Sequence, residues 1–205
     1  MKLLEIFLTR KHFLLFPLLV FSAGALFCQS KKEKLFNETV TRVIEAFSKQ
    51  DSIALAGLTD PKTSVYHLYR GNTYLGIITL AAVSFTTPGR FANQLRDCKN
   101  IQPAVLEYTK LPEWNCDTEE WDKRGLFVDT TLHDHMLSEG CIFKNRYEPG
   151  SYPQKLVAFY KKIEARSRRV ILQDANGKEL CFYLTLKNGR WYLTIIDKAS
   201  SDCSV

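Results

Sequence analysis

The segment His133-Asp134-His135 is the densest group of residue types that can bind a metal ion. On a strand, His133 and His135 would point to the same side and could share one ion. A third ligand would have to come from Asp129, Glu139 or elsewhere in the chain. The pair lacks the four-residue helical spacing and the glutamate base of a zinc protease. We therefore favour two exposed loop histidines and no metal, with a site at His133 and His135 as the alternative.

His67 is the histidine that lies inside an apolar, strand-like run, between Tyr66 and Leu68. With a carboxylate opposite, such an imidazole can act as a general base near neutral pH. A hydrogen-bonded structural histidine explains the same pattern. We favour the structural role for His67, with a catalytic role as the alternative.

Other sequence motifs of enzymes are absent. The sequence has no phosphate-binding loop, dinucleotide-binding glycine pattern, serine-hydrolase elbow or EF-hand loop. Cys141 and a neighbouring histidine would supply a thiol nucleophile and its base, but nothing in the pattern orients them. We expect no cofactor and favour a protein that is not an enzyme. A small hydrolase or isomerase that uses His67 is the alternative.

The elements that would position these residues are clear in the N-terminal half of the chain. Apolar residues recur every three or four positions within Glu33–Gln50, which predicts a helix with one buried face. Asp51-Ser52 ends this helix and predicts a short second helix through Ile53–Leu58. A turn follows, and two strands are expected at Ser64–Arg70 and Tyr74–Phe85.

The C-terminal third is equally regular. A second apolar helical stripe, of Leu156, Phe159, Tyr160 and Ile163, is expected in the helix that begins at Gln154. It is followed by three strands, at Arg168–Gln173, Glu179–Leu186 and Trp191–Asp197. The strands are joined by Asn-Gly dipeptides, which favour tight hairpins because both residues tolerate positive φ.

The Asn188-Gly189 turn sets the register of the last hairpin. The pairs it predicts on one face are Leu186 with Trp191, Leu184 with Leu193 and Phe182 with Ile195. The opposite face would carry Cys181, Tyr183, Tyr192 and Ile196, with Val170 and Leu172 beside them. Since both faces are apolar, we expect one to pack on the helices and the other to bind a cover, a partner or a ligand.

The middle of the chain, about residues 93–153, has many prolines and glycines and no sustained periodicity. We expect short strands and loops inserted into a simpler core. Residues 31–205 would then form a single α+β domain.

Two helices, strands and a terminal antiparallel meander ending in Asn-Gly-Arg-Trp-Tyr-Leu resemble the NTF2-like (cystatin-like) α+β cone. The resemblance covers Glu33–Phe85 and Arg168–Asp197. It implies helices packed on a curved, mainly antiparallel sheet, with a pocket between sheet and helices. Members of that family include enzymes and pure binding domains, so the fold does not decide the activity.

The first residues predict export. Lys2, Arg10 and Lys11 precede the uncharged run Phe13–Phe21, and small residues follow, an order typical of a signal peptide over residues 1–28. The strongly apolar part is shorter than a membrane span needs, so we favour cleavage over an uncleaved anchor. Cleavage is expected between residues 25 and 30. The alternative is a lipoprotein acylated on Cys28, although a bulky Phe precedes that cysteine.

The cysteines indicate disulfides, because an exported chain reaches an oxidising compartment. The candidates are Cys98, Cys116, Cys141, Cys181 and Cys203, with Cys28 as a sixth if it stays thiol-bearing in the mature chain. No Cys-x-x-Cys pair suggests a redox motif or a zinc knuckle.

The charge balance is mildly basic, with a formal net charge of +6. The basic clusters, at Lys31–Lys34 and Lys161–Arg169, lack interleaved aromatic residues, which argues against nucleic-acid binding. We interpret them as a solvated helix face and a strand edge. The sequence thus predicts an exported, periplasmic or extracellular, non-catalytic binding or structural protein. Its partner would be an envelope protein or a small apolar or glycan ligand, and it would meet a membrane only through a lipid anchor.

Overall fold

The computed structural model describes residues 16–71, 74–86, 90–132 and 134–203. Its elements, in chain order, are α1 (Phe16–Lys49), α2 (Ser52–Leu58), β1 (Val65–Gly71), β2 (Tyr74–Leu80), α3 (Arg90–Arg96), β3 (Leu106–Tyr108), β4 (Trp114–Asn115), β5 (Glu120–Trp121), β6 (Gly125–Val128), α4 (Met136–Tyr147), α5 (Gln154–Glu164), β7 (Ser167–Gln173), β8 (Glu179–Lys187) and β9 (Arg190–Asp197). His133 lies outside the described residues, as do the side chains of residues 16–30, Cys28 included.

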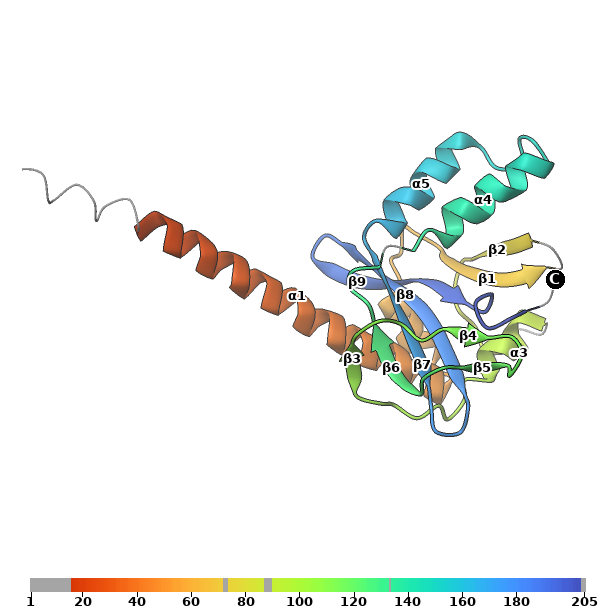
Figure 1. Ribbon diagram of the computed structural model, residues 1–205, viewed down its shortest axis with the longest axis horizontal. Helices are drawn as coiled ribbons and strands as arrows, with labels where there is room; N and C mark the ends of the chain where they lie inside the picture. Colours follow the sequence, from red (N-terminus) through yellow and green to blue (C-terminus); the bar gives the residue numbers. More distant parts are fainter. Residues whose placement is uncertain (1–15, 72–73, 87–89, 133, 204–205) are drawn as a thin grey trace, which may run out of the picture.

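Seven strands form one mixed sheet in the order β2-β1-β9-β8-β7-β6-β3. The pairs β1–β9 and β3–β6 are parallel and the other pairs are antiparallel. Strands β4 and β5 form a separate small hairpin. Helices α1 and α2 lie against one face of the sheet, and α4 and α5 lie over the other (Figure 1). The predicted α+β class is confirmed.

Helix α1 provides the core of the first face. Phe36, Val43 and Phe47 are fully buried against the sheet, as the apolar spacing predicts. The helix is longer than the predicted Glu33–Gln50, because it begins at Phe16, and its N-terminal part extends away from the body (Figure 1). Among the residues described, no helix is long and apolar enough to cross a bilayer.

Asp51 starts α2 as predicted. Its carboxylate accepts hydrogen bonds from the backbone N–H groups of Ile53 and Ala54, at 3.0 and 2.9 Å. These are two of the N–H groups that the first turn of a helix leaves without a backbone partner. The reversal between α1 and α2 is therefore encoded by one local side chain.

The terminal hairpin contains one irregularity that the sequence pattern missed. Leu186 and Leu184 pair with Trp191 and Leu193 as predicted, but Thr194 is an extra, bulged residue. Phe182 therefore lies opposite Ile196, and the predicted pairing of Phe182 with Ile195 is wrong. An inserted residue moves every later side chain to the other face.

This shift changes which residues share a face. Ile196, together with Val170 and Leu172, packs in the core under α1. Ile195 joins Tyr183 beneath α4 and α5. The predicted grouping of Ile196, Val170 and Leu172 with Tyr183 is therefore wrong.

The second face of the sheet is largely covered by the chain itself. Tyr183 is buried under α4 and α5, and Cys181 is buried under the β4–β5 hairpin with Trp121. The cover is thus provided by the predicted helix α5 together with α4 and the β4–β5 hairpin, which belong to the segment without sustained periodicity. Of the four residues predicted as a partner face, only Tyr192 keeps a half-exposed side chain on it.

Helix α4 is the largest element that the sequence analysis missed in residues 93–153. Its N-cap residue, His135, makes no capping hydrogen bond. Glu164 at the end of α5 does so instead, accepting from the backbone N–H of Ser138 at 3.0 Å and from its hydroxyl at 2.6 Å. Because the capping carboxylate comes from a distant helix, no local capping pattern exists to be read.

One disulfide is present among the described cysteines, between Cys116 and Cys203. It links the turn between β4 and β5 to the C-terminal segment across 87 residues of chain. Cys98, Cys141 and Cys181 are buried free thiols. Their prediction as disulfide partners is wrong, because each lies in a different apolar cluster.

Candidate functional site

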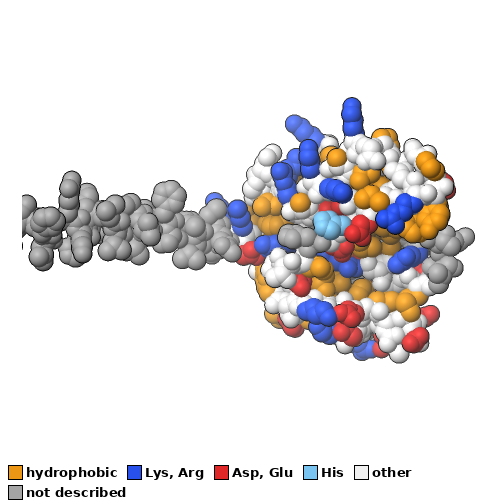
Figure 2. Space-filling view, turned by 45° about the horizontal axis from the view of Figure 1, so that its top comes forward, with side chains coloured by type: hydrophobic (Ala, Val, Ile, Leu, Met, Phe, Trp, Pro, Cys, Tyr) orange, Lys and Arg blue, Asp and Glu red, His pale blue; other side chains and the backbone are white. Residues whose placement is uncertain are grey.

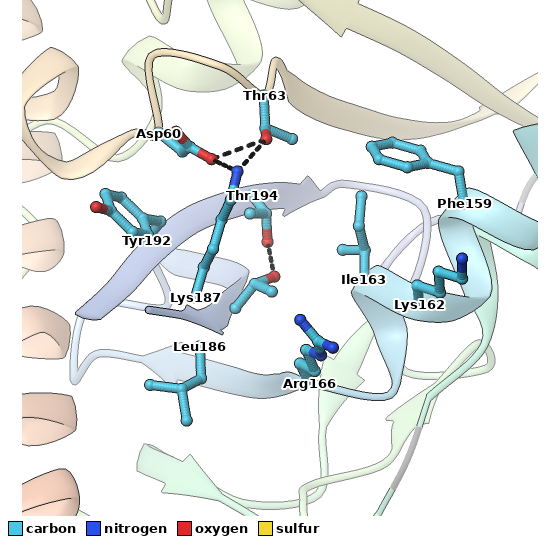
Figure 3. A pocket seen from close by; sticks show the side chains of 11 residues that line it. Asp60, Thr63, Phe159, Lys162, Ile163, Arg166, Leu186, Lys187, Tyr192 and Thr194 are labelled. Carbon is cyan, nitrogen blue, oxygen red and sulfur yellow. Dashed lines mark hydrogen bonds and ion pairs between the residues drawn. The ribbon is translucent and has the colours of Figure 1, made fainter. Parts of the chain in front are cut away.

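A pocket opens at the end of the β8–β9 hairpin, between that hairpin, α5 and the loop joining α2 to β1 (Figure 3). Its volume is about 220 Å³. It is lined by Asp60, Thr63, Phe159, Lys162, Ile163, Arg166, Thr185, Leu186, Lys187, Tyr192 and Thr194. This is the part of the second sheet face that α4 and α5 leave open.

The hydroxyl-bearing residues Thr185 and Thr194 form the floor of the pocket, and Ser167, which does not line it, lies beside them. The Ser167 and Thr185 hydroxyls lie 2.7 Å apart, and the Thr185 and Thr194 hydroxyls lie 2.6 Å apart. Ser167 also donates to the carbonyl of Ile163 at 2.9 Å, which ties the chain of hydroxyls to the end of α5. Thr194 reaches this position because it is the bulged residue of β9. The three hydroxyls are buried and satisfied by one another, so the floor is rigid and polar.

One ion pair closes the side of the pocket nearest α2. Lys187 reaches from the hairpin to the carboxylate of Asp60 and lies 3.3 Å from the hydroxyl of Thr63 (Figure 3). The pKa of Asp60 is lowered from its ordinary value, first by the hydrogen bond from Lys187 and against the effect of burial. Asp60 also accepts from the backbone N–H of Lys62, which holds the turn in place.

Two further cations line the pocket without such a partner. Lys162 and Arg166 are exposed, and among the residues described neither forms an ion pair. Figure 3 shows the guanidinium of Arg166 turned toward the space between the hairpin and α5. Asp60 is the one acidic residue among those described around the pocket, and it is paired with Lys187, so this lining carries an excess of positive charge.

The walls are apolar. Phe159 and Ile163 stand one helical turn apart on α5, and Tyr192 and Leu186 belong to the hairpin. Phe159 was predicted to belong to the buried stripe of α5, yet it is 42% exposed. The buried stripe of α5 runs instead through Val157, Tyr160 and Ile163. A large apolar side chain left exposed at a pocket rim is suited to contact a ligand.

The described residues that line the pocket include no histidine or cysteine, the Thr185 and Thr194 hydroxyls are hydrogen-bonded to each other, and the Asp60 carboxylate is ion-paired. The groups that remain for a ligand are therefore cations and apolar side chains. Positive charge over apolar walls favours a small anion that carries an apolar group.

His67 lies away from this pocket. Its side chain is fully buried, its ring centroid is 5.2 Å from that of Phe91, and neither ring nitrogen has a hydrogen-bond partner among the described residues. Burial lowers the pKa of His67 to about 4. A general base must reach the proton that it removes, so this position gives no support to catalysis by His67. The hydrogen bond expected of a structural histidine is also missing.

The predicted histidine pair is described only in part, because His133 lies outside the described residues. His135 Nδ1 lies 3.8 Å from the carboxylate of Glu164. The described residues contain no group of three or more potential ligands positioned for a metal ion. The partner of His135 is thus the carboxylate that caps α4.

A second polar cluster is buried beside the β4–β5 hairpin. Arg169 donates to Asp197 at 2.9 Å and to Asp134 at 3.3 Å. Its Nε also donates to the sulfur of Cys181 at 3.3 Å, and burial raises the pKa of that thiol. A thiol held in its protonated form is a poor nucleophile, so we interpret this cluster as structural. Arg169 is therefore no part of a solvated strand edge, contrary to the sequence prediction.

No protein-family model, no curated protein and no solved structure matches this chain. The assignment of a function therefore rests on the residues of the chain themselves.

The sequence analysis did not single out this pocket. Lys162 and Arg166 belong to the basic cluster that was interpreted as solvated, and Asp60 was part of a turn. The signal that could have revealed the pocket was this basic cluster together with the exposed Phe159, which lies one helical turn before Ile163. Nothing local to these residues shows that the α2–β1 loop comes to lie beside them.

Proposed function

We propose that this chain is an exported, non-catalytic binding protein whose pocket takes a small anion bearing a compact apolar group. The observation that carries the proposal is the pairing of unpartnered cations, Lys162 and Arg166, with apolar walls around one cavity. An anion would gain charge-assisted hydrogen bonds from these two side chains. Its apolar group would displace water from Phe159 and Ile163.

The size of the pocket limits the ligand. About 220 Å³ is the volume of roughly seven water molecules at about 30 Å³ each. It is also below the usual range for drug-sized ligands, roughly 300–1,000 Å³. Aromatic or short-chain carboxylates, sulfonates and phosphate monoesters fit this limit, whereas a long glycan would have to lie mostly outside.

Export is supported by two independent features. The order of charge, apolar run and small residues at the N-terminus is that of a signal peptide. The Cys116–Cys203 disulfide is of the kind that persists in an oxidising compartment. The NTF2-like resemblance is part of the same proposal, on the order of helices, first hairpin and terminal meander.

Isothermal titration of the full chain with benzoate tests this proposal, with benzamide and acetate as matched ligands. Benzamide keeps the ring and removes the charge, and acetate keeps the charge and removes the ring. We expect benzoate to bind at least about tenfold more tightly than either, because only benzoate addresses both the cations and the walls. Equal affinity for benzoate and benzamide would show that the cations do not select an anion.

A further inference from the structure

A second hollow, of about 500 Å³, lies where α1 meets the body. It is lined by Lys32, Thr130, Ala165, Arg166, Ser167, Arg168, Leu186, Asn188, Gly189 and Trp191. None of these described lining residues is acidic, and three of them are cations. The hollow is thus a basic recess at the base of the helix.

The direction in which α1 leaves the body is fixed by specific contacts. Arg168 donates to both carboxylate oxygens of Glu33, at 2.7 and 2.8 Å. The indole N–H of Trp191 donates to the backbone carbonyl of Lys32 at 3.2 Å. The Arg168 guanidinium also lies 5.0 Å from the ring centres of Phe36 and Trp191. These contacts fix the first buried turn of α1 in chain order. The N-terminal part of the helix therefore leaves the body at a defined place on this face (Figure 1).

The surface around this exit carries net positive charge. Lys31, Lys32, Arg166 and Arg190 are exposed there. Figure 2 shows Lys and Arg side chains gathered beside the base of α1 and over the adjacent upper face.

The carboxylates near the exit do not cancel this charge. Glu33 is paired with Arg168, and Glu38 lies 4.0 Å from Lys34. Asp129, next to the lining residue Thr130, accepts hydrogen bonds from the neutral backbone and hydroxyl of Thr131, so it keeps its charge and offsets one of the four exposed cations. The cations at the exit therefore outnumber the carboxylates that face the same solvent.

We propose that this basic face docks on an anionic phospholipid surface, with the recess receiving headgroup phosphates. The sequence of the emerging helix supports that occupant. Cys28, the candidate lipidation site, lies three residues before Lys31, about 5 Å along a helix at 1.5 Å per residue. An acyl chain on Cys28 would thus enter the bilayer from the face that carries the cations.

Electrostatic attraction would add to the membrane binding that an acyl chain provides. Each Lys or Arg near an anionic bilayer strengthens binding to it. A single acyl chain gives only marginal binding, so a basic patch beside it decides whether the protein stays bound. The recess shares Arg166 and Leu186 with the ligand pocket, whereas Lys31 and Lys32 do not line that pocket, so substitutions of these two lysines test the docking separately.

Co-sedimentation of the full chain with vesicles tests the proposal. One set of vesicles contains phosphatidylglycerol and phosphatidylcholine, and the other contains phosphatidylcholine alone. The test variant combines Lys31→Glu with Lys32→Glu. The matched control combines Lys99→Glu with Lys178→Glu, which makes the same charge change at the opposite end of β8, by the Asn176-Gly177 turn.

We expect preferential binding to the anionic vesicles, weakened by salt, and a loss of at least about tenfold in the test variant alone. Equal binding to both vesicle types overturns the proposal, because the cations would then contribute nothing to binding. An equal loss in both variants overturns it as well, because net charge rather than this face would act. Benzoate binding by the test variant should be unchanged, which separates this result from the fate of the pocket proposal.

Discussion

Lys187 of β8 and Asp60 of the α2–β1 loop form an ion pair that joins two parts of the chain 127 residues apart. The pair forms one side of the pocket and uses the one carboxylate among its described lining residues. Lys162 and Arg166, at the end of α5, remain free to bind a ligand.

Replacement of Asp60 by Asn should strengthen binding of anions. Asn keeps an oxygen that can accept from the backbone N–H of Lys62, so the turn should persist. Removal of the negative charge frees Lys187, and we expect benzoate affinity to rise about fivefold, the equivalent of about 1 kcal/mol. Calorimetry of the two proteins measures this, and a decrease in affinity would contradict the assignment of the pocket.

Replacement of Lys162 or Arg166 by Ala should weaken benzoate binding about fivefold in each case, because each removes one exposed cation from the pocket. Lys161→Ala is the matched control. It removes the same charge from the adjacent, exposed position on α5 without touching the pocket. Identical losses in Lys161→Ala and Lys162→Ala would mean that binding follows overall charge only.

His67 should make the fold sensitive to acid. Its pKa is about 4 in the folded chain and near 6.5 when unfolded, so the unfolded chain binds the proton first as pH falls. Stability is therefore lost below about pH 6.5, by about 3 kcal/mol at pH 4, where the loss levels off.

Urea unfolding of the natural chain and of His67→Phe between pH 7 and pH 4 measures this effect. Carboxylates with lowered pKa values, such as Asp60 and Glu33, are protonated over the acid part of that range, which lowers the free energy of unfolding of both proteins. The difference between the two pH profiles therefore isolates His67. Parallel profiles would show that His67 is not protonated on unfolding.

Reduction of the Cys116–Cys203 disulfide should lower the free energy of unfolding by about 2–4 kcal/mol, because the bond closes a long loop of the unfolded chain. The double variant Cys116→Ala with Cys203→Ala should match the reduced protein. Denaturant titrations of the oxidised, reduced and double-variant proteins check this. Equal stability of all three would contradict a structural role for the bond.

Glu164→Ala should destabilise α4, since the backbone N–H and hydroxyl of Ser138 lose a buried charged acceptor. We expect a cost of about 2–3 kcal/mol. Glu139→Ala, an exposed carboxylate in the first turn of the same helix, serves as control and should cost far less. Hydrogen exchange of the α4 amides reports the effect locally, and unchanged protection in Glu164→Ala would refute the cap.

The elements that the sequence predicted correctly are those whose signals are local. The apolar spacing of α1, the Asp51 cap of α2 and the Asn188-Gly189 turn each act within a few residues. These sufficed for the helices and strands at both ends of the chain.

The failures arise where distant residues decide the outcome. The start of α4 depends on Glu164, a residue 26 positions away. The bulge at Thr194 is stabilised by hydroxyl contacts across the sheet. The pocket itself needs Asp60 beside Lys187, and no pattern in a single segment shows that meeting.

The central claim is that the cavity beside Lys162 and Arg166 is where an amphiphilic anion binds. Amide chemical-shift mapping of the full chain during titration with benzoate tests it most directly. We predict that the largest shifts fall on Thr63, Ile163, Arg166, Thr185 and Thr194, and that benzamide leaves these amides nearly unmoved. Shifts confined to another part of the chain, or equal shifts with both ligands, would contradict it.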